Sequence, residues 1–158
     1  MALPEENFAA EGLLIGALLR VPYTVVAETL EKGLAAAGYR EVRKAHFPVL
    51  QYLSERPEGA RTTDLAAWAH ITIPSMVYLV NFLQEHGYVE RLPDPVDGRA
   101  QSVRLTARGL EVVRTNRKLV RQIEADWEAR IGASRMEQLK QILRDLIASL
   151  MESGQGVR

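Results

Sequence analysis

The chain has 158 residues, of which 47% are hydrophobic and 25% charged, and its formal net charge is zero, so one globular domain with a hydrophobic core is expected. It contains no cysteine, which excludes disulfides and cysteine-ligated metals. The histidines, His46, His70 and His86, lack the spacing of a metal site, and neither a metal nor another cofactor is expected.

The N-terminal part is predicted to be helical. Residues 6–37 carry a broad apolar face at helical spacing, and Pro22 predicts a kink or a break just before it. The apolar run over residues 12–19 is too short to span a bilayer, and it follows glutamates where a signal peptide needs positive charge. We therefore expect a cytoplasmic protein without a membrane segment. A further helix is expected over residues 42–54.

Residues 62–86 are predicted to form a helix-turn-helix. A short helix starts near Thr62, a break follows at residues 70–72, and a second helix covers about residues 73–86. Thr72 is a good N-cap, and Pro74 lies in the first turn, where a missing N–H does no harm. The buried stripe of the second helix recurs at helical spacing and consists of Met76, Leu79, Val80 and Leu83.

A β-hairpin is predicted directly after this second helix. Gly87 closes the helix, and residues 88–92 and 101–105 alternate like two strands around a Pro-Asp-Pro-Val-Asp-Gly loop. A second helix presented outward beside a basic hairpin is an arrangement for reading duplex DNA.

The C-terminal part is predicted to be two helices. Thr106 caps a helix that runs to about residue 130, Gly132 breaks it, and residues 136–151 form the last helix before a frayed tail. Together with the N-terminal helix, these segments carry more apolar surface than a small winged domain can cover. The alternatives are an intramolecular helical cap and a two-fold dimer of interlocked helices.

The distribution of charge favours a DNA partner although the net charge is zero. Residues 91–121 contain eight basic and three acidic residues, a local balance of +5, whereas residues 1–60 have a balance of −2. Concentrated positive charge on the hairpin and the following helix is what phosphate contacts require. The plainer interpretation is a solvated helix face.

The segment from residue 64 to residue 109 resembles the multiple antibiotic resistance regulator (MarR) family of bacterial transcription factors. The residues that carry this resemblance are Leu65-Ala66, Pro74-Ser75, Leu79-Val80, Leu83, Gly87-Tyr88-Val89-Glu90-Arg91, Asp97-Gly98-Arg99-Ala100 and Leu105-Thr106-x-x-Gly109. The Asp-x-Arg-Ala loop followed by Val-x-Leu-Thr-x-x-Gly is the most specific part, because many winged helices lack it.

The resemblance implies a mainly α-helical fold, a winged helix-turn-helix with a small β-hairpin wing and long terminal dimerisation helices. The expected divisions are an N-terminal dimerisation region (1–41), a DNA-binding domain (42–105) and C-terminal dimerisation helices (106–158). The implied function is a dimeric transcriptional regulator, a repressor, that binds pseudo-palindromic duplex DNA. The chain has no catalytic motif, and we do not expect an enzyme.

The candidate DNA contacts lie on the second helix and the wing. Arg99 is implied to enter the minor groove, with Asp97 as its orienting partner; a plain hairpin turn with an exposed ion pair is the alternative. No Lys or Arg lies between Arg61 and Arg91, so direct base reading by the helix is expected to be weak. The full set is Thr72, Ser75, Val77, Tyr78, Asn81, Arg91, Asp97, Arg99 and Arg104.

A small aromatic or phenolic effector is implied by the resemblance alone. The polar and aromatic residues that are candidates for lining its crevice are Arg20, Tyr23, Tyr39, His46 and Trp68, each with ordinary packing as the alternative. A second hypothesis for the whole chain is a protein-interaction module that kept the winged fold, lost strong DNA binding, and uses the uncharged surface of residues 73–82.

Overall fold

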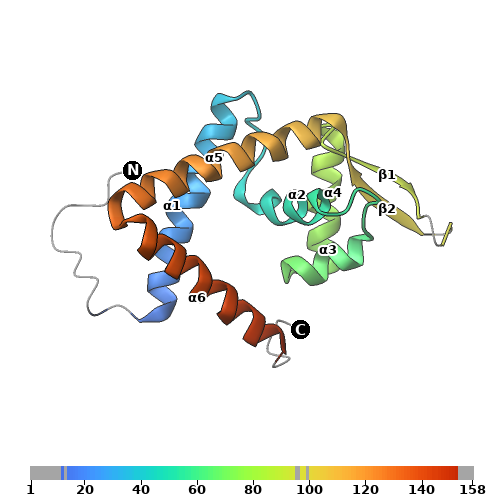
Figure 1. The fold of residues 1–158 in the computed structure, drawn as a ribbon. Coiled ribbons are helices and arrows are strands. Elements are labelled where there is room, and N and C mark those ends of the chain that lie inside the picture. The colour runs from blue at the N-terminus through green and yellow to red at the C-terminus, as the bar shows by residue number, and fades with distance from the viewer. Residues whose placement is uncertain (1–11, 13, 95–96, 99, 153–158) are drawn as a thin grey trace.

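In the computed structural model, which describes residues 12, 14–94, 97–98 and 100–152, long helices flank a small helical domain with one hairpin (Figure 1). The elements in chain order are α1 (Ile15–Ala36), the 3-10 turn η2 (Lys44–His46), α2 (Phe47–Ser54), α3 (Thr62–Ala69), α4 (Ile73–Glu85), β1 (Val89–Pro93), β2 (Gln101–Leu105), α5 (Ala107–Ile131) and α6 (Ala133–Glu152). The predicted winged helix-turn-helix, mainly α with a two-stranded hairpin, is confirmed.

The helix-turn-helix forms where the sequence places it because each helix end is capped locally. α3 stops at His70, which adopts a left-handed conformation with φ of 54°. The hydroxyl of Thr72 then accepts a hydrogen bond from the Ser75 N–H at 3.3 Å and starts α4. Gly87, with φ of 73°, ends α4 and turns the chain into the hairpin.

The hairpin is antiparallel and is tied to the helical domain by a third segment. Its register runs from Val89 opposite Leu105 to Pro93 opposite Gln101. Ala60, which precedes α3, exchanges two backbone hydrogen bonds with Val103, at 3.0 and 2.8 Å. The base of the wing is therefore fixed to the start of the helix-turn-helix.

A close backbone approach joins the hairpin to α5. The hydroxyl of Thr106 accepts from the Gly109 N–H at 3.1 Å and donates to the Gly87 carbonyl at 2.6 Å. A Cβ at Gly109 would overlap the backbone carbonyl oxygen of Tyr88. The Leu-Thr-x-x-Gly pattern is thus a structural requirement, since the threonine caps α5 and the glycine leaves room for the strand before it.

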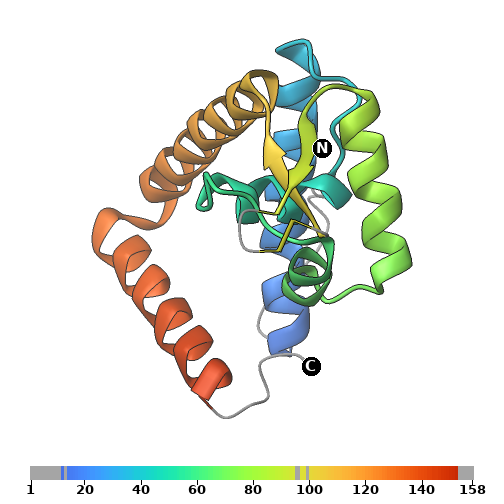
Figure 2. The ribbon, with the colours of Figure 1, turned by 90° about the vertical axis from the view of Figure 1, so that its right-hand side faces the viewer.

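The long helices form a scaffold beside the winged domain. α1 packs along α5, and α6 packs against the end of α5 that is remote from the hairpin. Figure 2 shows α6 and α4 at opposite sides of the molecule. Gly132, with φ of 90°, makes the turn between α5 and α6.

Several helix bounds differ from the sequence predictions, and α1, predicted from residue 6, begins at Ile15. The helix expected over residues 42–54 is divided into η2 and α2, because Pro48 has no N–H to donate to the carbonyl four residues earlier. α1 continues through Pro22 without a break, since Pro22 lies on the exposed side while Ala27, Leu30 and Leu34 bury the other. α6 begins at Ala133 rather than at residue 136.

Candidate nucleic-acid interface and internal cavity

α4 has one buried face and one exposed face. Met76, Val80 and Leu83 are fully buried in the core. On the other side, Ile73 is 51%, Val77 38% and Tyr78 70% exposed. Thr72 and Ser75, whose hydroxyls lie 2.9 Å apart, are exposed at the start of the helix. The predicted contact residues of α4 therefore do lie on an accessible surface.

Arg91 supplies this surface with a positive charge that α4 itself lacks. From β1, its guanidinium donates to Asn81 Oδ1 at 2.7 Å and to Gln84 Oε1. Two residues predicted as separate DNA contacts, Asn81 and Arg91, are thus one unit that bridges wing and helix. The hydrophobic periodicity of the sequence did not predict the contact between Arg91 and Asn81 or the one with Gln84. Both contacts depend on how the hairpin folds back on α4.

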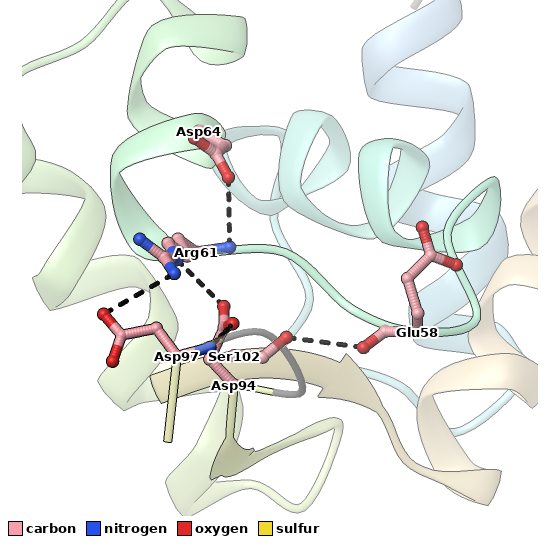
Figure 3. Close-up of polar contacts among 6 residues, drawn as sticks. All are labelled: Glu58, Arg61, Asp64, Asp94, Asp97 and Ser102. Carbon is pink, nitrogen blue, oxygen red and sulfur yellow. Dashed lines mark hydrogen bonds and ion pairs between the residues drawn. The ribbon is translucent and has the colours of Figure 1, made fainter. Parts of the chain in front are cut away.

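Arg61 organises the root of the wing (Figure 3). Its Nε donates to Asp94 Oδ2 at 2.8 Å, and its Nη2 lies 3.9 Å from Asp97 Oδ2. The hydrogen bond to Asp94, followed by the charge of that carboxylate, raises the pKa of the Arg61 guanidinium. Asp94 also accepts from the Asp97 N–H at 2.9 Å, so one arginine and one aspartate hold the root of the wing loop.

The other wing residues are placed as follows. Arg104 lies on β2 directly opposite Glu90 and is half-buried. Arg99 falls outside the described residues, so the predicted pairing of Asp97 with Arg99 stays a prediction. Sequence reasoning missed Arg61, whose role depends on the bridge between Ala60 and β2.

A cavity of about 440 Å³ opens between α1, α2 and α5. Its wall is mostly apolar, with Tyr23 on α1 and Phe47 on α2 among the aromatic residues. The side-chain oxygen Asn116 Oδ1 is buried and has no hydrogen-bond partner within the described part of the chain. At the edge, Arg117 bonds to Glu55 at 2.6 Å and to Ser54 at 3.3 Å, which connects α5 with α2.

The structure does not gather the predicted effector residues in one place. Tyr23 lines the cavity, whereas Arg20 lines a separate, smaller hollow along α1. Tyr39 packs edge-on against Tyr88 with ring centroids 6.4 Å apart, and Trp68 lies on Tyr52 at 5.4 Å. Asn116 and Arg117 were missed, because polar residues on a long helix give no sign of which ones face a cavity.

His46 is buried beneath α4 instead of lining the cavity. Its ring stacks on Phe82 with centroids 4.8 Å apart, and Phe82 stacks in turn on His86 at 4.2 Å. The Arg43 N–H donates to His46 Nδ1 at 3.0 Å. Burial, and then the charges of His86 and Arg43, lower the pKa of His46. The histidine is therefore held neutral as a hydrogen-bond acceptor.

The described residues form neither a metal-binding cluster nor a single helix that could span a membrane. No group of three or more His, Cys, Asp or Glu side chains there is arranged to hold a metal ion. No single helix of that part is long and apolar enough to cross a membrane; α3 and α4 reach the composition only together, and they are bent by 111° at their break.

Sequence comparison connects this geometry to known proteins. A profile of the MarR family matches residues 42–100. HTH-type transcriptional regulators of Mycobacterium bovis and Mycobacterium leprae are each 33% identical over 99 residues, which cover 60% of this chain and 66% of each relative. The chain thus spans 66% of the length of these curated relatives.

Solved structures share the fold along most of the chain. CouR from Rhodococcus jostii RHA1, bound to p-coumaroyl-CoA, is 26% identical with a TM-score of 0.67, over 84% of this chain and 90% of that one. A Mycobacterium tuberculosis MarR family protein in complex with salicylic acid is 28% identical with a TM-score of 0.65, over 87% and 98%. Reduced MarR from E. coli, 21% identical with a TM-score of 0.73 over 85% and 97%, has the same fold.

Proposed function

Because the chain belongs to the MarR family of transcriptional regulators, we propose that it is a homodimeric repressor that places one α4 in the major groove of each half of a pseudo-palindromic site. The observation that carries the proposal is the exposed face of α4 beside a hairpin with arginines at its root. A helix held in this way, with a wing next to it, suits the docking of a helix-turn-helix on duplex DNA. The family is one of regulators, and we propose no catalytic activity.

Exposed apolar side chains on the long helices support the dimer. Leu18, Leu19 and Tyr23 are exposed on α1, and Leu139, Ile142, Leu146 and Ile147 are exposed on α6. Apolar surface of this extent on two neighbouring scaffold helices favours burial against a second copy. A two-fold dimer would also present two α4 helices to two half-sites, as a palindrome requires.

The cavity between α1, α2 and α5 supports control by a small aromatic acid. Its size is in the range of small-molecule sites, and its wall is mostly apolar. Asn116 Oδ1 needs a donor, which a phenolic hydroxyl supplies, and Arg121 at the lining offers charge for a carboxylate. The relatives bound to p-coumaroyl-CoA and salicylic acid carry ligands of related chemistry.

DNA binding is tested by fluorescence anisotropy with the duplex immediately upstream of the chain's own gene, at several salt concentrations. We expect an affinity that falls steeply with salt, because phosphate contacts release counterions. The variant Arg99→Ala should bind more weakly by about 1–3 kcal/mol if the arginine enters the minor groove. Wild-type protein that binds no duplex from this region or from a random pool would overturn the proposal.

The effector site is tested by thermal shift with salicylate as the probe, followed by DNA titration. We expect salicylate to stabilise the wild type and to lower its DNA affinity, because an effector acts only through different affinities for two states. Asn116→Leu should lose the shift while keeping the fold, since it removes an unsatisfied buried oxygen. Gln141→Leu, an exposed amide on α6, is the control and should keep the shift. If salicylate shifted the melting temperature of Asn116→Leu as much as that of the wild type, the cavity would not be the effector site.

A further inference from the structure

The exposed face of α4 has an unusual order of side chains. Ile73, Val77, Asn81 and Gln84 follow one another at the spacing of a single helix face, and all are exposed. The first two are aliphatic, and the last two are amides held by Arg91. The residues from 62 to 90 include no Lys or Arg. The first half of this face therefore presents two aliphatic side chains beside the exposed hydroxyls of Thr72 and Ser75, and its second half presents two amides bound to the charged Arg91 of β1.

This order determines which base edges the helix can read. In a helix-turn-helix, the N-terminal residues of the second helix contact the bases. Guanine is normally read by Arg or Lys, which this segment lacks, whereas the only apolar group in the major groove is the C5-methyl of thymine. Resting on the proposed DNA-binding function, we propose that Ile73 and Val77 recognise thymine methyl groups and make the half-site thymine-rich.

Arg91 is a positioning residue in this arrangement. Its guanidinium occupies Asn81 Oδ1 and Gln84 Oε1, so each amide turns its NH₂ group outward as a donor. An amide fixed in this way can donate to phosphate oxygens or to the acceptor atoms of bases. It is less suited to the two-point contact with adenine, because that contact also uses the amide oxygen. The charge of Arg91 beside them fixes the end of α4 over the phosphate backbone.

The charge around the face favours DNA over a protein as the occupant. Arg91 lies on the face itself, where its guanidinium bonds to Asn81 and Gln84. A polyanion matches this charge, and its grooves bring methyl groups to the exposed Ile73 and Val77. An apolar protein partner would leave the charge of Arg91 without a counterpart.

The experiment separates the methyl group from every other feature of the base. A duplex is first selected from a random pool by the wild-type protein, and each thymine of the half-site is then replaced by deoxyuridine, which lacks only the C5-methyl. We expect about fourfold weaker binding for each contacted methyl, as one buried methyl group contributes about 0.8 kcal/mol. Substitution outside the half-sites should have no effect.

Protein variants assign the methyl contact to α4. In Val77→Ala, the penalty at one thymine should disappear, because the methyl has lost its partner, while Val77→Thr, which keeps one methyl group, should retain part of it. Leu110→Ala, a similarly exposed aliphatic residue on α5, is the matched control and should show the full wild-type penalty. Arg91→Gln should bind all sequences more weakly and show a smaller salt slope, with the deoxyuridine penalty unchanged.

The outcomes separate this proposal from the function on which it rests. Specific DNA binding with equal affinity for thymine and deoxyuridine duplexes overturns methyl recognition and leaves the DNA-binding function standing. A penalty that persists undiminished in Val77→Ala and in Ile73→Ala also overturns it, since the methyl contact then lies elsewhere. A protein that selects no duplex at all overturns both, and the α4 face is then a surface for a protein partner.

Discussion

At the scale of single residues, Gly109 shows how the backbone can dictate a side chain. Its Cα lies so close to Tyr88 that a Cβ would overlap a backbone carbonyl, which cannot rotate away as a side chain can. We expect Gly109→Ala to destabilise the protein by about 1–3 kcal/mol, the typical cost of overpacking. Urea denaturation measures the difference.

Gly16→Ala is the matched control for this prediction. Gly16 is also helical, but a Cβ there would meet nothing within 4 Å, so alanine should leave stability unchanged or raise it slightly. A Gly109→Ala protein as stable as the wild type would show that the hairpin can move relative to α5.

His46 predicts a pH dependence of stability. Its folded-state pKa is lowered by burial, so below about pH 6.5 the unfolded chain takes up a proton that the folded chain does not. Stability should therefore be lost as the pH falls from about 6.5 toward the lower folded-state value. Protonation of Nδ1 would also oppose the Arg43 N–H that now donates to it.

The variant His46→Asn isolates this effect. Its side-chain oxygen can accept from Arg43, but it does not titrate, so the part of the acid sensitivity that belongs to His46 should disappear. Denaturation midpoints at pH 7.5 and 5.5 give the comparison. An equal loss in both proteins would show that the acid sensitivity belongs to another group.

At the scale of elements, local signals predicted most of the fold. Thr72 and Gly87 placed the ends of α4 because capping is decided within a few residues. The division between η2 and α2 could have been predicted from Pro48, whose missing N–H is also a local feature. The contacts of Arg91 and Arg61 could not, since each joins segments whose proximity exists only after the hairpin has folded.

The wing root gives an element-scale prediction. Arg61→Gln removes the guanidinium that bonds to Asp94 and lies 3.9 Å from Asp97, so the root of the wing loses one positive charge. The pair is partly exposed, so the loss of stability should stay below about 1 kcal/mol. DNA affinity should fall much more, because the wing loses its orientation and gains repulsion from phosphates.

Arg144→Gln is the control for the wing root. It removes another exposed ion pair, with Glu137 on α6, far from the wing. We expect it to change neither the denaturation midpoint nor the anisotropy titration appreciably. If Arg61→Gln bound DNA as tightly as this control, Arg61 would have no part in orienting the wing.

At the scale of the whole molecule, α6 is the helix whose apolar residues are least accounted for by packing within one chain. Its first half packs against the end of α5, through Met136, the half-buried Leu143 and an ion pair between Lys140 and Glu124 at 2.9 Å. Ile142, Leu146 and Ile147 are exposed instead, and Ile142 is 63% exposed. The sequence predicted excess apolar surface but could not say which residues a monomer buries, because that depends on the turn at Gly132.

This distinction sharpens the dimer prediction. Replacing Leu143 would damage the packing of α6 on its own chain, whereas the double variant Ile142→Glu with Leu146→Glu places charge only on the exposed face. Light scattering at micromolar protein should give a dimer mass for the wild type and a monomer mass for this variant, with helicity retained in circular dichroism.

Binding to a full operator should fall to the affinity of a single half-site, since the two α4 helices are no longer linked. Leu110→Glu introduces the same charged side chain on α5, at a residue as exposed as Leu146, and should remain dimeric. A dimer mass for the double variant would move the interface away from α6, and a monomer mass for the wild type would end the two-fold arrangement on which reading a palindrome depends.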